Sequence, residues 1–281
     1  MDKLWPITAR LDEQALLSLG DIPVTALARD YGTPLYIFDE ATLRGRAAEY
    51  RAALAAHYPA TAQAAYAAKA YLCTALAQLI AEEGLDLDVV SGGELYVALQ
   101  AGFPADRIHF HGNNKSRDEL AYALDSGIGR IVVDNFHELA LLAELAASRP
   151  AAKPISIWLR LAPGVSAHTH AHIQTGQEDT KFGFSIASGD AERAVVAALG
   201  QPALALVGFH SHIGSQIYEP DALALAACRL ADFAAQMHER HGFQLRELSP
   251  GGGWGVPMTA ADPEAPIKPY VAALARAVVT A

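Results

Sequence analysis

Lys69 is the residue of this chain whose surroundings most favour covalent chemistry. It follows a short apolar run and is flanked by alanines, in the segment Tyr66-Ala67-Ala68-Lys69-Ala70. A lysine partly removed from water has a lowered pKa and a nucleophilic amine, as bond formation with a carbonyl carbon requires. The side chain could equally extend from the strand end into solvent, as lysines commonly do. Sequence position alone leaves both interpretations open.

Three consecutive glycines follow the last apolar run, in Ser249-Pro250-Gly251-Gly252-Gly253. Glycines let backbone N–H groups approach an anion closely, so such turns bind phosphate. A phosphate site after the late strands also recurs in parallel barrels. A flexible turn is the plainer alternative, and the placement of the run favours the phosphate site.

Alternating histidines follow the preceding strand, in His210-Ser211-His212-Ile213-Gly214-Ser215. Ser215 could donate a hydrogen bond to a phosphate, and the flat His212 ring could stack on a planar cofactor. The alternation also places two imidazoles on one side of a strand, which is typical of metal sites. Further sets of this kind are His109/His111 and His168/His170/His172. A metal-dependent barrel hydrolase is therefore an alternative from another class, although it would also need a late acidic ligand.

Two charged residues, Asp88 and Arg160, lie within apolar strand segments. Ser91, shortly after Asp88, is a candidate cap for the helix that follows. Arg160 needs an acceptor if it is buried, and Asp88 or a cofactor oxygen would supply one. Cys73, four residues after Lys69, fits a core position better than a nucleophile.

Short apolar runs alternate with helical patterns along the chain, which predicts βαβ units and a parallel sheet. The predicted strands are residues 64–67, 87–90, 108–110, 130–133, 155–161, 204–209 and 245–248, and residues 35–38 form a further candidate outside the series. The predicted helices include residues 72–83, 93–102, 116–127 and 135–148, with Gly84, Gly102 and Gly127 as C-terminal caps. The first four strands recur roughly every 20 to 25 residues, the rhythm of a (β/α) barrel. No G-x-G-x-x-G follows the first of them, which disfavours a doubly wound sheet.

The composition predicts a soluble, acidic, globular protein of the cytoplasm. The 281 residues are 52% hydrophobic and carry a formal net charge of −10, so no basic surface is expected to bind nucleic acid. No stretch of about 18 apolar residues suits a membrane span, and the N-terminus lacks the apolar core of a signal peptide. The two cysteines, Cys73 and Cys228, are far apart and predict reduced thiols.

Taken together, these segments resemble the pyridoxal-phosphate-dependent decarboxylases of ornithine, diaminopimelate and arginine, which have the alanine-racemase-like fold. The resemblance covers nearly the whole chain in the expected order, and the long loop between the fifth and sixth strands resembles the diaminopimelate branch. The motifs are residues 66–70, 88–95, 111–116, 133–135, 163–165, 167–170, 175–176, 181–183, 210–216 and 251–253. The implied fold is α/β, a (β/α)8-type TIM barrel.

The resemblance also implies a role for each candidate site residue. Lys69 would carry pyridoxal 5'-phosphate and His212 would stack on its ring, which makes these two the expected catalytic residues. Ser215, Gly251, Gly252 and Gly253 would bind the phosphate, with Asp88 and Arg160 around the ring. No metal is implied.

The reaction implied by the resemblance is the decarboxylation of meso-2,6-diaminoheptanedioate to L-lysine and carbon dioxide, a step of lysine biosynthesis carried out by a homodimer. The alternative with the same chemistry is a related decarboxylase that acts on another diamino acid.

Members of this family continue past the triple-glycine turn with an eighth strand bearing Glu-Pro-Gly-Arg and with a C-terminal β-domain, neither of which this chain contains. We therefore expect residues 41–281 to form an incomplete barrel domain and residues 1–40 to belong to the absent β-domain. Without the acidic partner the ring nitrogen is less readily protonated, and an unclosed barrel leaves two sheet edges unpaired. We expect this 281-residue chain to have little or no activity alone.

Overall fold

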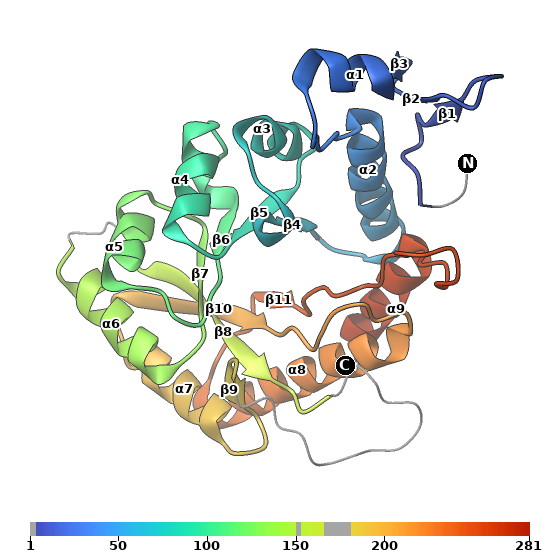
Figure 1. Ribbon diagram of the computed structural model, residues 1–281. Coiled ribbons are helices and arrows are strands. Elements are labelled where there is room, and N and C mark those ends of the chain that lie inside the picture. The colour runs from blue at the N-terminus through green and yellow to red at the C-terminus, as the bar shows by residue number, and fades with distance from the viewer. Residues whose placement is uncertain (1–3, 150–152, 166–180) are drawn as a thin grey trace.

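The protein is built around one parallel β-sheet, seen in a computed structural model that describes residues 4–149, 153–165 and 181–281 (Figure 1). Seven strands follow one another in the order β11-β10-β8-β7-β6-β5-β4, and β9 pairs with β8 off this path. The strands are β4 (Ala65–Ala67), β5 (Asp86–Val89), β6 (Ile108–Phe110), β7 (Arg130–Val133), β8 (Ile155–Ala162), β9 (Phe184–Ser185), β10 (Leu204–His210) and β11 (Glu247–Ser249). All seven strands of the predicted series are confirmed, and β9, within the long loop, was not predicted.

Helices cover the outer face of the curved sheet (Figure 1). They are α2 (Glu40–His57), α3 (Thr74–Glu82), α4 (Gly92–Gln100), α5 (Arg117–Asp125), α6 (Phe136–Ala147), α7 (Asp190–Leu199), α8 (Pro220–His241) and α9 (Ile267–Thr280). The four helices named from the sequence are confirmed, and the three predicted capping glycines have positive φ angles. Ser91 also caps α4 as predicted, because its Oγ accepts a hydrogen bond from the Glu94 N–H at 3.2 Å.

The two faces of the sheet differ because alternate residues of a strand point to opposite sides. Outward residues such as Leu87, Phe110 and Ile131 pack against the helices in the main hydrophobic core. On the inner side, a small apolar cluster of Val132, Trp158 and Val207 forms a layer of its own. Most other inward positions are polar, so the sheet carries charged and histidine side chains toward its carboxyl ends.

Local hydrogen bonds explain where strand ends differ from prediction. Val90 leaves β5 because its N–H donates to the Glu94 carboxylate at 2.7 Å instead of to the sheet. His210 joins β10 because it pairs with Arg160 on one side and Ser249 on the other. This extension carries the histidine into the polar end of the sheet.

Residues 35–38 were predicted as a strand, and that prediction was wrong. No described strand lies beside them to accept their hydrogen bonds, and Tyr36 is 92% exposed. Phe38 instead stacks on the Tyr71 ring, with centroids 4.7 Å apart. Asp39 then caps α2 by accepting a hydrogen bond from the Thr42 N–H.

The sheet stays open between its two edge strands, whereas the layer of helices around it is closed. Within the described residues β4 and β11 are edge strands, each hydrogen-bonded to a neighbour on one side. The helices α2 and α9 nevertheless pack together across this opening, through a cluster that includes Ala53, Tyr270 and Val271. The fold is therefore a seven-stranded barrel sheet that is open between β4 and β11.

Short elements precede α2. The strands β1 (Arg10–Leu11), β2 (Leu17–Leu19) and β3 (Ile22–Pro23) form a separate antiparallel sheet, followed by α1 (Val24–Tyr31). Across the described segments, every helix is too short or too polar to cross a membrane.

Replacing Gly208 in β10 with alanine tests the β10–β11 register. The added methyl group would overlap the backbone carbonyl oxygen of Glu247, so we expect the free energy of unfolding to fall by about 3 kcal/mol. Gly45, in the exposed interior of α2, is the matched control, since a methyl group there meets open space. Gly45→Ala is expected to raise the free energy of unfolding by about 0.5–1 kcal/mol. Urea unfolding of both variants measures the difference, and wild-type stability of Gly208→Ala would contradict this register.

Candidate functional site

Lys69 lies at the carboxyl end of the sheet, in a short 3-10 turn (Ala68–Ala70) that follows β4 directly. The strand before it pairs with β5 through Ala67 and Asp88. The Tyr66 hydroxyl donates to the Tyr71 carbonyl oxygen at 2.8 Å, which holds the turn closed around the lysine. Lys69 is exposed.

The glycine turn after β11 lies directly against the loop that follows β10. Gly251 and Gly253 have φ angles of 81° and 101°, and a methyl group on either would overlap a carbonyl oxygen, of Ser211 and Gly214 respectively. The Ile217 N–H donates to the Gly253 carbonyl oxygen at 2.9 Å and joins the two loops. Glycine is thus required at two of the three positions by both backbone angle and space.

His212 lies against the glycine turn. A methyl group on Gly253 would approach its ring, and the charges of Lys69 and Arg160 act on it. Burial, together with these two positive charges, lowers the pKa of His212 to about 4. Ser215, three residues later in the same loop, is exposed. The structure therefore places His212 against the glycine turn, where the charge of Lys69 also acts on it.

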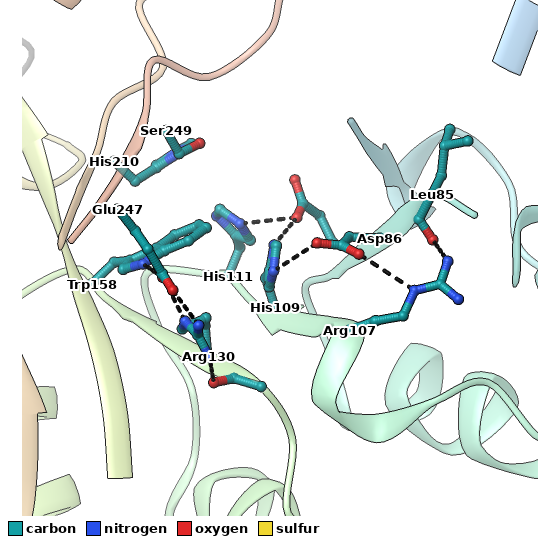
Figure 2. Close-up of polar contacts among 12 residues, drawn as sticks. Leu85, Asp86, Arg107, His109, His111, Arg130, Trp158, His210, Glu247 and Ser249 are labelled. Atoms are coloured by element: carbon teal, nitrogen blue, oxygen red, sulfur yellow. Dashed lines mark hydrogen bonds and ion pairs between the residues drawn. The ribbon is translucent and has the colours of Figure 1, made fainter. Parts of the chain in front are cut away.

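Asp88 lies on β5 beside two histidines of the next strand. Its Oδ1 is 3.1 Å from His109 Nδ1 and 3.4 Å from His111 Nε2. On its other side, His109 Nε2 is 3.5 Å from Asp86 Oδ2, and Figure 2 shows the contacts running on from Asp86 to Arg107. Burial alone would raise the pKa of Asp88, but the nearby His111 charge and the hydrogen bond with His109 outweigh it. They hold that pKa well below its ordinary value.

His210 completes the histidine group from β10. Its ring lies edge-on to the His111 ring at 4.7 Å, and its Nδ1 is 3.0 Å from Ser249 Oγ. Complete burial, with the nearby His111 charge, holds the pKa of His210 well below its ordinary value, so this ring stays neutral.

Arg160 pairs with Asp134 rather than with the predicted Asp88, which binds His109 and His111 instead. The Arg160 Nη1–Asp134 Oδ1 distance is 3.5 Å, and the guanidinium lies 4.4 Å from the centre of the Phe182 ring. Arg160 and Phe182 also line a cavity that His212 borders. The largely buried arginine therefore has its acceptor, from the residue that follows β7 and not from β5.

Two ion pairs, the first of them buried, were missed by sequence reasoning. Lys115 and Glu138 have side chains that are 1% and 3% exposed and lie 2.8 Å apart, and the Lys115 amine also donates to two backbone carbonyls. Burial lowers the pKa of Lys115 and raises that of Glu138, and their mutual attraction opposes both shifts.

The second missed pair joins opposite parts of the inner face. Arg130 Nε donates to Glu247 Oε2 at 2.6 Å, and Trp158 Nε1 donates to the same oxygen at 2.7 Å (Figure 2). Arg130 and Trp158 lie within the strands 130–133 and 155–161 expected from the sequence, but nothing in the sequence indicated that Glu247 on β11 is their shared partner.

Part of the predicted loop motif, including His168, His170, His172 and Thr175-Gly176, lies outside the described residues. Among the residues that the structure does describe, no group of three or more His, Cys, Asp and Glu side chains is arranged to hold a metal ion.

These features define an α/β-barrel protein with its functional groups at the carboxyl ends of parallel strands. The sequence profile of the pyridoxal-binding domain of pyridoxal-dependent decarboxylases matches residues 40–281, and the chain belongs to this family. Diaminopimelate decarboxylase of Halalkalibacterium halodurans is 47% identical over 271 residues, covering 96% of this chain and 61% of the relative. The Bacillus subtilis enzyme of the same name is 46% identical with the same coverage. The chain thus spans 61% of the length of these curated relatives.

Solved structures agree with the fold. Diaminopimelate decarboxylase from M. jannaschii in complex with L-lysine superposes with a TM-score of 0.89 at 29% identity, covering 98% of this chain and 63% of that one. The lysine/ornithine decarboxylase from Vibrio vulnificus complexed with putrescine gives a TM-score of 0.71 at 24% identity, covering 91% of this chain and 62% of that one. At 24% identity, the similarity to the Vibrio vulnificus enzyme shows a shared fold only.

Because burial lowers the pKa of His212, the free energy of unfolding is expected to depend on pH. An unfolded histidine takes up a proton near pH 6.5, whereas the folded pKa is about 4. Between these values the unfolded chain binds more protons, so stability falls as the pH is lowered from 7 to 4. The contribution of His212 to this loss is about 2–3 kcal/mol. Urea unfolding at a series of pH values should show a shallower loss for His212→Gln than for wild type, and equal pH dependence would contradict the assignment.

Proposed function

We propose that this chain carries the cofactor-binding site of an enzyme that decarboxylates meso-2,6-diaminoheptanedioate to L-lysine and carbon dioxide, a step of lysine biosynthesis. The observation that carries the proposal is the convergence of Lys69, His212 and the glycine turn at one end of the sheet. Identities of 46–47% to diaminopimelate decarboxylases over 96% of the chain support this substrate.

The described residues fit pyridoxal 5'-phosphate. The backbone of the glycine turn lies directly against the carbonyl oxygens of Ser211 and Gly214, whereas nothing lies within 4 Å of a methyl group built on Gly252, so the turn is open at that position. In the described chain, the N–H groups of Gly252 and Gly253 donate to no other backbone carbonyl. We assign the phosphate to this turn and to Ser215, where such N–H groups bind anions well.

The remaining roles follow from charge and position. We assign Lys69 as the amine that binds the cofactor carbonyl carbon and His212 as the ring that stacks on the cofactor. Because the His212 pKa is about 4, this ring is neutral near pH 7 and adds no positive charge beside the cofactor. Asp88, held ionised by its histidines, and Arg160 would lie around the cofactor ring. When bound, pyridoxal phosphate supplies an electron sink for the pair released as the carboxylate departs.

We further propose that residues 1–40 belong to a second domain, with residues 41–281 as the cofactor-binding barrel. The separate antiparallel sheet β1–β3 and the start of the family match at residue 40 support this division. We also propose a cytoplasmic homodimer. The unpaired state of Cys73 and Cys228 fits a reducing compartment, and the dimer is proposed from the family resemblance.

Borohydride reduction in the presence of pyridoxal phosphate should trap the cofactor on Lys69. The expected result is one modified residue, found by peptide mass analysis, because Lys69 directly follows β4 and its charge acts on His212, which lies against the glycine turn. Lys69→Arg is expected to lower trapping about tenfold or more, and Lys268→Arg, in α9, serves as the matched control. Equal labelling of both variants would refute the assignment of Lys69.

Substrate class is tested by protection from the same trapping reaction. The amine of meso-2,6-diaminoheptanedioate competes with Lys69 for the cofactor, so prior incubation should lower Lys69 labelling. L-Ornithine and L-arginine at equal concentration should protect about tenfold less well, a difference of about 1.4 kcal/mol in binding. Equal protection by all three would favour a decarboxylase of another diamino acid.

A further inference from the structure

The two carboxylate oxygens of Asp88 have different surroundings. Oδ1 lies within 3.4 Å of nitrogens from both His109 and His111. No hydrogen bond or ion pair within the described segments reaches Oδ2, and the side chain is 27% exposed. One oxygen is thus held by the protein, and the other remains available as an acceptor.

Strand register explains why both histidines reach the same carboxylate. Asp88 of β5 is the register partner of His109 on β6. His111 lies two residues further along the same face, just past β6, where its N–H continues the ladder by donating to Val89 at 2.7 Å. Alternation along the strand therefore stacks the two rings one above the other beside Asp88.

Each of the two histidine rings is also held by a contact other than the one with Asp88. Asp86 lies 3.5 Å from the far nitrogen of His109, and the Trp158 ring packs on the same imidazole with centroids 4.7 Å apart. His111 packs edge-on against His210. Rings immobilised in this way can orient a carboxylate with little further loss of side-chain entropy.

The available oxygen belongs to the proposed cofactor site. Lys69 lies two residues beyond Ala67, the register partner of Asp88 on β4. The charges of Lys69, His111 and Asp88 all act on His212. The carboxylate therefore lies on the strand beside the one that leads to Lys69, and its charge acts on the His212 ring.

We propose that His109 and His111 are positioning residues, which hold Asp88 through Oδ1 and present Oδ2 to the cofactor on Lys69. This inference rests on the proposed function. It assigns His109 and His111 a role without placing either in contact with the reacting atoms. The chemistry recognised by Oδ2 is a positively charged nitrogen or an N–H donor at the cofactor.

His109 and His111 face Asp88 with different ring nitrogens, and this difference gives a direct test of the positioning role. An asparagine amide places its nitrogen where Nδ1 was, and a glutamine amide reaches the position of Nε2. His109 faces Asp88 with Nδ1, so His109→Asn should keep wild-type affinity for pyridoxal phosphate and His109→Gln should lose about tenfold. His111 uses Nε2, so the order should reverse, with His111→Gln conservative and His111→Asn about tenfold weaker.

Affinity is measured by titrating the chain with pyridoxal phosphate and following the absorbance of the bound cofactor. His57→Gln, at the end of the outer helix α2, is the control that removes an imidazole far from Asp88 and should bind normally. Equal affinity of the Asn and Gln variants at either histidine position would overturn the positioning role. Failure of the wild-type chain to bind pyridoxal phosphate would instead overturn the proposed function, and the inference with it.

A second measurement needs no cofactor. Urea unfolding of Asp88→Asn, His109→Leu and the double variant forms a thermodynamic cycle. The contact predicts a coupling of about tenfold in the unfolding equilibrium constant. Additive effects of the two substitutions would show that His109 does not hold Asp88 and would overturn the inference.

Discussion

Charge on the inner face of the sheet must be paired, because ions removed from water are costly to leave alone. The pairs form between strands that neighbour each other or face each other across the interior. Asp88 binds the histidines of β6, Arg130 on β7 binds Glu247 on β11, and Arg160 on β8 binds Asp134 just after β7. Each pair ties one strand to another, so the polar interior and the order of the strands depend on each other.

The geometry of the site depends on two places where backbone segments approach each other closely. The glycine turn can lie against the loop after β10 because Gly251 and Gly253 have no side chains. The β10–β11 pairing beneath it depends in the same way on Gly208. His212 is held in the first of these contacts, which is why its ring is partly removed from water and its pKa is low. Burial and charge at the site are therefore consequences of main-chain packing.

Sequence reasoning located the parts of this site that depend on local rules. Strand series, helix caps such as Ser91, the position of Lys69 at a strand end and the glycine turn all follow from residue type and spacing over a few positions. Pairings across strands did not follow, because they depend on register and ring orientation. Asp88 was one candidate acceptor for Arg160, which pairs with Asp134 instead, and the buried Lys115–Glu138 pair was not recognised. Residues 35–38 have strand-forming side chains, but a strand also needs a neighbour.

The contact between α2 and α9 has a consequence for the order of folding. Strands of the large sheet pair with strands that are near in sequence, whereas α2 and α9 come from distant parts of the chain. The entropy of closing so long a loop is recovered only when the intervening strands are already assembled. Docking of these two helices is therefore a late event in folding. The same seam, beside the open edge of the sheet, is where local unfolding would begin.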